Sequence, residues 1–350
     1  MKQLVRLKDI ATYSKGLQIN GDELVDRAEF DYLNGGINPS GKWNEANCVA
    51  NTITISEGGN SCGYVNFMTK PFWCGAHCYY LHNTIDNSRY LYYALKSQQE
   101  RIMKLRSGAC MPNIKKRDLG NFEFIFDYDV KEQEKVTLVL SKLENVIEAR
   151  KQELLALDNL IKARFVEMFG DPVLNPLGWD VKPVIDICDC MVPGRDKPKS
   201  FTGAIPWITI DDLIVNSTTF RSKQGLGLTE AEISEVKRKT IPVGSVMMSC
   251  VGNLGICSIA GNEMIINQQL HSFQCHSEIN NVFLMYYLGQ RKDYMEKQAS
   301  STTVLYMNKS ICNSIPVIIP DLELQEQFAD FVNQVNKSKI VAETEYHTAL

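Results

Sequence analysis

Several features common in other classes of protein are missing from this sequence. No apolar run approaches the roughly 20 residues that cross a bilayer, so we expect a soluble protein. The eleven cysteines are odd in number, follow no spacing of a disulfide framework and come without a signal peptide, which indicates reduced thiols in the cytoplasm. The net charge of −4 argues weakly against a free-standing nucleic-acid-binding protein.

Catalytic motifs are missing as well. There is no Gly-x-x-x-x-Gly-Lys-Ser/Thr loop for a nucleotide phosphate. There is no Asn-Pro-Pro-aromatic tetrapeptide of an amino-methyltransferase, which Asn175-Pro176-Leu177-Gly178 does not match. The five histidines do not combine with a serine or cysteine in a known catalytic pattern. We therefore expect no catalytic residue and no bound cofactor in this chain.

What the sequence does contain is a long internal repeat. The matched tracts are Tyr90–Leu95 with Phe283–Leu288, Asn113 with Asn308, Asn121–Phe126 with Ser314–Ile319, Glu132–Glu134 with Leu324–Glu326 and, near the starts, Leu7–Ile10 with Val184–Ile187. A period this long exceeds the roughly 20–50 residues of solenoid repeats, so it indicates a duplicated domain. A duplicated domain predicts two similar binding tasks.

Two helices are expected after the two repeats. Residues 130–169 contain neither proline nor glycine, and apolar residues recur in a seven-residue pattern that predicts a coiled coil, although Arg150 and Arg164 interrupt one stripe. A helix of roughly 58 Å is too long to be only an amphipathic helix on its own small domain. The second, shorter helix begins near Glu323 and runs to the end of the chain. The residues expected to pair the helices are Leu140, Leu143, Ile147, Leu154, Leu157, Ile161, Phe328, Phe331 and Val335.

Outside these helices, short β-branched segments such as Thr52–Ile55 and Ile205–Ile210 predict strands separated by glycine-rich turns, and helical spacing covers Ser88–Arg106. The expected fold class is α/β (α+β), with two tandem domains of mixed strands and helices and two long helices in an antiparallel, pseudo-twofold coiled coil. The expected boundaries are 1–130 for the first domain, 131–170 for the first helix, 171–322 for the second domain and 323–350 for the second helix.

A zinc site is one interpretation of Cys74, His77, Cys78 and His82, which lie close in the sequence. Structural zinc usually takes ligand pairs that are well separated along the chain. The equivalent stretch of the second repeat, 267–275, keeps only His271 and Cys275. A metal essential to the fold would appear in both repeats, so we expect none.

Taken together, the sequence resembles the specificity subunit of type I restriction-modification systems over its whole length. The tracts that carry the resemblance are Leu160–Pro172 with Asn175-Pro176 and Gly178-Trp179, Ile205–Ile208 with Asp211–Leu213, Tyr32–Pro39, and Pro320–Gln327. The resemblance implies that each repeat is a target recognition domain for one part of a split DNA site, and that the helices set the gap between the parts. It also implies that the partners of the chain are double-stranded DNA, two modification subunits and a restriction subunit. These partner subunits would bind S-adenosylmethionine, ATP and Mg, and would carry out adenine methylation, translocation and cleavage.

DNA-contacting residues are sought among exposed amides and basic side chains, because Asn pairs with adenine, and Lys and Arg pair with guanine or phosphate. A basic cluster can equally be an ordinary solvated face. The candidates are Asn34, Asn38, Lys42, Trp43, Arg106, Asn113, Lys115, Lys116, Arg195, Lys197, Lys199, Arg221, Lys223, Asn308 and Lys309. We expect positions shared by the repeats to grip the DNA backbone, and positions that differ to specify sequence.

Two alternatives to a type I subunit stay open at this point. One is the specificity subunit of a related system whose partner is a fused methyltransferase and nuclease. The other is a coiled-coil scaffold with two protein-binding domains and no role on DNA.

Overall fold

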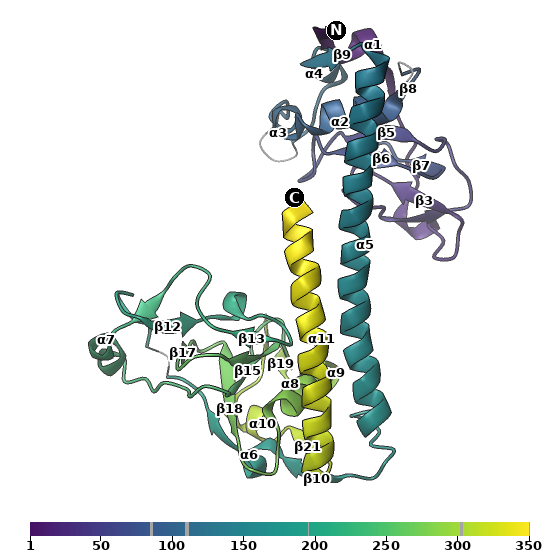
Figure 1. The fold of residues 1–350 in the computed structure, drawn as a ribbon. Coiled ribbons are helices and arrows are strands. Elements are labelled where there is room, and N and C mark those ends of the chain that lie inside the picture. The colour runs from purple at the N-terminus through teal and green to yellow at the C-terminus, as the bar shows by residue number, and fades with distance from the viewer. Residues whose placement is uncertain (85–86, 109–111, 195, 302–303, 350) are drawn as a thin grey trace. The chain divides into compact units, whose positions relative to one another are not determined.

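The computed structural model describes residues 1–84, 87–108, 112–194, 196–301 and 304–349, with only the backbone for residues 301 and 343–349. The chain forms two compact units, Met1–Ile147 (the N-terminal unit) and Glu148–Leu350 (the C-terminal unit). The boundary falls within one long helix, α5 (Val130–Phe169; Figure 1). No helix in the described part of the chain is long and apolar enough to cross a membrane.

Three small sheets form the N-terminal unit. One pairs β1 with β9, one has the order β2-β8-β5-β6, and one has the order β4-β3-β7. The helices are α1, α2, α3, α4 and the start of α5. The elements are β1 (Lys2–Arg6), α1 (Leu7–Ile10), β2 (Thr12–Lys15), β3 (Phe30–Leu33), β4 (Gly41–Trp43), β5 (Thr52–Ser56), β6 (Val65–Met68), β7 (Phe72–Cys74), β8 (Cys78–His82), α2 (Ser88–Lys96), α3 (Gln99–Met103), α4 (Lys116–Gly120) and β9 (Glu123–Asp127).

The C-terminal unit repeats this plan with additions. Its sheets are β10-β21, β11-β18-β15-β16-β13, β14-β12-β17 and β19-β20. The strands are β10 (Asp180–Pro183), β11 (Cys188–Met191), β12 (Ile205–Ile208), β13 (Thr218–Thr219), β14 (Gly227–Leu228), β15 (Val246–Ser249), β16 (Cys257–Ala260), β17 (Ile265–Ile266), β18 (Leu270–Cys275), β19 (Ser300–Ser301), β20 (Leu305–Tyr306) and β21 (Pro316–Ile319). The helices are α6 (Val184–Ile187), α7 (Glu230–Glu235), α8 (Asn281–Gly289), α9 (Lys292–Gln298), α10 (Lys309–Asn313) and α11 (Leu322–Ala349).

The internal repeat is confirmed by matching topology. The order β2-β8-β5-β6 corresponds to β11-β18-β15-β16, and β3 and β12 each have one antiparallel and one parallel neighbour. The helices α2 and α8 agree residue by residue. Asn87 caps α2 and Asn280 caps α8, and the separation in sequence from Asn87 to Tyr90 equals that from Asn280 to Phe283. Gln133 and Gln325 also donate to main-chain carbonyls before their long helices.

One pairing in the predicted repeat is wrong. The Ile114 amide donates to the Glu57 carbonyl, as the Met307 amide does to the Cys250 carbonyl. Asn113 therefore matches Tyr306, not Asn308, whose equivalent is Lys115. The error arose because matching by identical letters introduced a two-residue shift, whereas the spacing from the caps Asn87 and Asn280 to these positions is the same in both units. The shared basic position is Lys116 with Lys309, each the first residue of a short helix.

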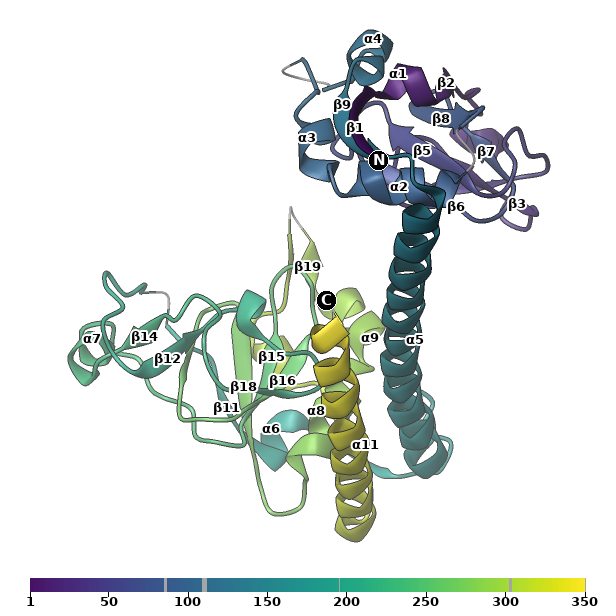
Figure 2. The same cartoon turned by 45° about the horizontal axis from the view of Figure 1, so that its top comes forward.

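The C-terminal unit has its core where α8 and the two long helices meet. Phe165 and Phe169 of α5 are fully buried against Phe283 of α8 and Phe328 of α11, with ring centroids 4.8–5.6 Å apart. In this unit α5 and α11 run antiparallel, because Asp158 pairs with Lys339 while Phe165, further along α5, meets the earlier Phe328 (Figures 1 and 2). The predicted antiparallel pairing of the two helices is thus present here.

The predicted pairing residues are buried to different degrees. Ile161, Phe328 and Val335 lie in the core, and Leu157 and Phe331 pack against it. Leu140, Ile147 and Leu154 are half-buried, whereas Leu143 is 38% exposed. The seven-residue pattern omitted Phe165 and Phe169, because the buried face here follows a four-residue spacing from Ile161. The pairing role of Leu140, Leu143, Ile147 and Leu154 stays a prediction.

Of two other local expectations, one needs refinement. The segment 88–106 is not one helix, because α2 ends at Lys96 and α3 follows; the hydroxyl of Ser97, the C-cap of α2, donates to the Ala94 carbonyl. The long helix ends as expected, with Gly170 at φ +78° followed by a turn closed by Asp171. The two amides that bind the Asp171 carboxylate lower its pKa. The functional division at residues 130, 170 and 322 stays a prediction.

Candidate nucleic-acid interface

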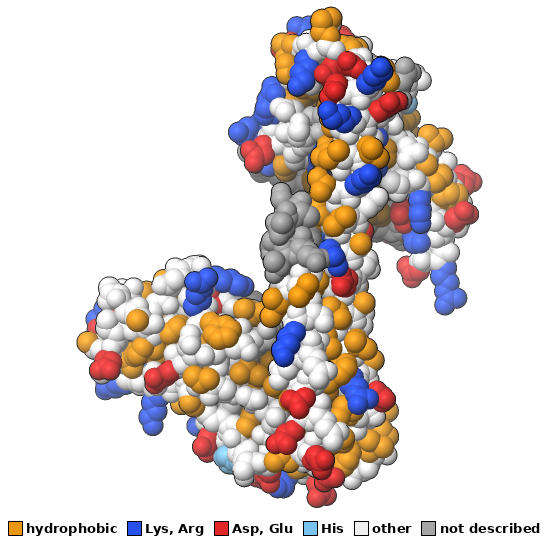
Figure 3. All heavy atoms as spheres, viewed as in Figure 1, with side chains coloured by type: hydrophobic (Ala, Val, Ile, Leu, Met, Phe, Trp, Pro, Cys, Tyr) orange, Lys and Arg blue, Asp and Glu red, His pale blue; other side chains and the backbone are white. Residues whose placement is uncertain are grey.

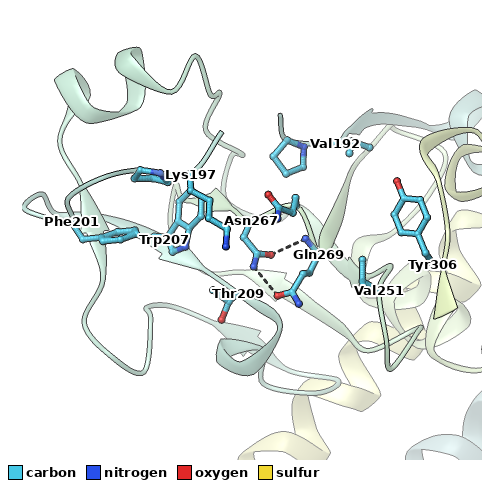
Figure 4. Close-up of a pocket in the computed structure, with 12 residues that line it drawn as sticks. Val192, Lys197, Phe201, Trp207, Thr209, Val251, Asn267, Gln269 and Tyr306 are labelled. Atoms are coloured by element: carbon cyan, nitrogen blue, oxygen red, sulfur yellow. Dashed lines mark hydrogen bonds between the residues drawn. The ribbon is translucent and has the colours of Figure 1, made fainter. Parts of the chain in front are cut away.

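The C-terminal unit contains a pocket of about 810 Å³ beside the ends of β11, β12 and β15 (Figure 4). Trp207 and Phe201 lie at one side of it, and Val251 and Tyr306 lie at the other. Exposed and half-buried polar side chains also line it: Lys197, Thr209, Asn267, Gln268 and Gln269. Aromatic surfaces combined with amides and a lysine can contact bases, sugars and phosphates.

Two amides in this pocket hold each other in place. The Asn267 Nδ2 donates to Gln269 Oε1 over 2.9 Å, and the main-chain N–H of Gln269 donates to Asn267 Oδ1 over 3.0 Å (Figure 4). The Gln269 Nε2 has no hydrogen-bond partner among the described residues. This arrangement leaves a donor, and the second lone pair of Oε1, for a ligand in the pocket.

The aromatic side of the pocket is supported from behind by Arg238. This arginine is buried, its guanidinium lies 4.7 Å from the Trp207 ring centroid, and it donates to the main-chain carbonyls of Asp196 and Ile266. Burial lowers the pKa of Arg238. The middle residue of the basic cluster 237–239 therefore supports the pocket wall and is not on a solvated face.

The loop that carries Lys197 and Phe201 is also tied down. Glu232, in α7, accepts hydrogen bonds from Ser200, Thr202 and Thr229. These donors stabilise the carboxylate and lower the pKa of Glu232 to about 2. The loop is thus held beside the pocket by a side chain that stays ionised at neutral pH.

The N-terminal unit has a smaller pocket of about 570 Å³, lined in part by Lys15, Asn34, Glu57, His77 and Asn113. Here Glu57 lies between two basic side chains: Lys15 Nζ lies 2.6 Å from Glu57 Oε1, and His77 Nδ1 lies 3.5 Å from Glu57 Oε2. The Asn34 side-chain oxygen, Oδ1, accepts a hydrogen bond from the main-chain N–H of His77. The structure thus brings together two of the predicted DNA-contacting residues, Asn34 and Asn113, with His77. From the sequence alone, His77 is a candidate only as a metal ligand.

Other predicted residues lie outside the two pockets. Arg221 and Lys223 line a separate hollow of about 600 Å³ with Phe220, next to β13. Figure 3 shows Lys and Arg side chains gathered on the edge of the C-terminal unit above β12. Asn38, Lys42, Arg106, Lys115, Lys116 and Lys309 are exposed. Their role on DNA stays a prediction.

Some candidates already have partners within the chain. The Asn308 side chain accepts the Ile311 amide as the cap of α10, and Lys199 pairs with Glu235 over 2.8 Å. Trp43 packs edge-on against Trp73, with ring centroids 6.3 Å apart. Lys223 donates to the Asp211 carbonyl. Arg195 lies outside the described residues.

The four residues weighed as zinc ligands are used in other ways. The Cys74 and Cys78 thiols are buried and donate to main-chain carbonyls, His77 faces Glu57, and His82 pairs with Ser14. Hydrogen bonding among the Cys48, Cys74 and Cys78 thiols raises the pKa of Cys74. Within the described ranges, no three His, Cys, Asp or Glu side chains are grouped to hold a metal ion.

Sequence reasoning missed most of the lining of the larger pocket, including Thr209, Asn267, Gln269 and Tyr306. These residues carry no recognisable motif. One signal was present: Gly59 and Gly252 both have positive φ, 74° and 72°, and their amides donate to Pro112 and Leu305 in the same way. Such shared glycines mark the turns beside both pockets.

Comparison with known proteins agrees with this duplicated architecture. The family model described as the type I restriction modification DNA specificity domain matches residues 2–158 and 176–347. A Mycoplasma genitalium protein provisionally named a type I specificity subunit is 36% identical over 138 residues, which cover 38% of this chain and 36% of that protein. A Mycoplasma pneumoniae counterpart gives the same identity and coverage. The matched segment thus spans about a third of these relatives.

A solved structure extends the likeness to the whole fold. The crystal structure of the type I restriction-modification S subunit from M. genitalium superposes with a TM-score of 0.67 at 20% identity, covering 100% of this chain and 93% of that one. Because the family model accounts for most of both units, the chain belongs to the family of type I restriction modification DNA specificity domains.

Proposed function

We propose that the protein is the DNA-recognition subunit of a type I restriction-modification complex. The observation that carries the proposal is the presence of a polar pocket in each unit of a duplicated specificity-domain fold. Each unit recognises one half of a split DNA target. Amides, the histidine and the lysines contact base edges and phosphates, which are the groups that DNA offers in its grooves.

The chain itself carries out no bond-making step. Its role is to bind and orient DNA, while modification subunits bring S-adenosylmethionine for adenine methylation, and a restriction subunit brings ATP and Mg for translocation and cleavage. Relatives named type I specificity subunits support these partners. A cytoplasmic location fits the same role.

The long helices act as the spacer between half-sites. The α5 helix runs unbroken for 40 residues, roughly 60 Å at about 1.5 Å per residue. The apolar contacts of Phe165 and Phe169 with Phe328 hold its last part against α11. The length of the paired helices then sets the number of unspecified base pairs in the gap.

The experiment is a base-resolution methylome of cells that express this chain with its cognate modification subunit, compared with cells that lack the chain. The proposal expects N6-methyladenine at one split motif, which defines both half-sites and the gap. No new methylation from a complex shown to assemble would contradict it.

A further inference from the structure

The two pockets occupy the same place in the two units. The Glu57 amide donates to the His77 carbonyl, and the Cys250 amide donates to the Gln269 carbonyl. The Gly75 amide donates to Leu33, as the Asn267 amide does to Ile208. These shared main-chain bonds make His77 equivalent to Gln269, and Asn34 equivalent to Thr209.

The side chains at these equivalent positions are all different. The strand register also makes Lys15 equivalent to Val192. Lys15 lies four residues after the C-cap of α1, and Val192 lies four residues after the C-cap of α6. The bridges Gly58–Asn113 and Val251–Tyr306 add two further pairs. The lining pairs are thus Lys15 with Val192, Asn34 with Thr209, Gly58 with Val251, Ala76 with Gln268, His77 with Gln269, and Asn113 with Tyr306. Positions that share a frame but differ in chemistry are what two domains need in order to bind different base pairs.

One pair stands out because each side chain has a polar neighbour at one end, a hydrogen bond for Gln269 and a 3.5 Å contact with a carboxylate for His77. Asn267 fixes the carbonyl end of Gln269, and Glu57 faces Nδ1 of His77. In both cases the far nitrogen, Gln269 Nε2 or His77 Nε2, has no partner among the described residues. A polar side chain oriented by a second residue loses less freedom when it binds, so it discriminates better between bases.

We infer that His77 and Gln269 are equivalent specificity-determining residues, each contacting one base pair in the half-site of its own unit; this inference rests on the proposed function. Gln269 has the donor and acceptor that match adenine N7 and N6, so its base pair is A·T. Asn267 is its positioning residue, and Glu57 has that role for His77.

The test uses the full chain assembled with its modification subunit, with methylomes and single-turnover methylation of duplexes that carry each single base change. Gln269→Ala should relax one A·T pair in one half-site, lowering discrimination there by roughly 5- to 150-fold, and should leave the other half-site unchanged. Asn267→Ala should relax the same base pair, more weakly. His77→Ala should relax one base pair of the other half-site.

The matched control is Gln298→Ala, a change at an exposed glutamine of α9 that should leave both half-sites unchanged. The inference is overturned if Gln269→Ala keeps full stringency, relaxes the half-site that His77→Ala relaxes, or weakens methylation of all duplexes equally. The last result would assign Gln269 a structural role. A wild-type complex that assembles but methylates no split motif would instead refute the proposed function.

Discussion

The strongest single test of the helix pairing is removal of the Phe165 ring. Phe165 is fully buried, and its centroid lies 4.9 Å from Phe169, 5.6 Å from Phe283 and 5.3 Å from Phe328. Phe165→Ala deletes one partner from each of these three aromatic contacts and leaves a cavity. Substitutions of this kind cost about 3–5 kcal/mol.

A cost near 4 kcal/mol should lower the melting temperature of the C-terminal unit by roughly 8–16 °C, at about 2–4 °C per kcal/mol for a unit of this size. The control is Val166→Ala at the next position, where the side chain is 46% exposed. That change should stay within about 0.5 kcal/mol.

The measurement is thermal melting combined with hydrogen exchange resolved by segment. Exchange should rise in residues 148–169 and 322–342 in the Phe165→Ala variant, while the β2-β8-β5-β6 sheet keeps its protection. If Phe165→Ala and Val166→Ala melt at the same temperature, the aromatic cluster does not hold α5 to α11, and the reasoning fails.

Two further predictions concern pH and salt. Burial lowers the pKa of His271 to about 4 from its usual 6.5, so the unfolded state binds more protons than the folded state between these two pH values. The free energy of unfolding should therefore fall by up to about 3 kcal/mol as the pH drops from above 6.5 to 4. His271→Gln should remove that part of the pH dependence in urea titrations; an unchanged slope would show that another group titrates. Lys116→Ala and Lys309→Ala should each weaken DNA binding by the complex for all sequences and reduce the slope of log K against log salt by about one. A changed methylation motif in either variant would contradict a phosphate contact.

The main elements of the fold were predictable because they depend on local and periodic patterns. The absence of proline and glycine over residues 130–169 predicted a helix, which spans Val130–Phe169. The match of Tyr90 with Phe283 is confirmed by equivalent helix caps. Apolar and capping positions recur between the units because both units need the same core.

The pockets were not predictable for the opposite reason. His77 and Gln269 share only their main-chain hydrogen bonds, which leave no trace in residue identity. Asn113 was matched to Asn308 because the letters agree, whereas hydrogen bonding places it with Tyr306. Arg238 stands between Lys237 and Lys239 in the sequence, which gives no sign of its role, because its contacts with Trp207 and the Asp196 carbonyl come from distant segments.

The main-chain frame shared by the two pockets has a consequence for how such a protein changes over time. The bonds that shape each pocket run from amide to carbonyl, at Glu57 and His77 in one unit and at Cys250 and Gln269 in the other. Every residue except proline supplies both groups. Under the proposed function, substitution at the lining would therefore alter what is recognised while costing little stability, and either half of the target could drift without disturbing the other.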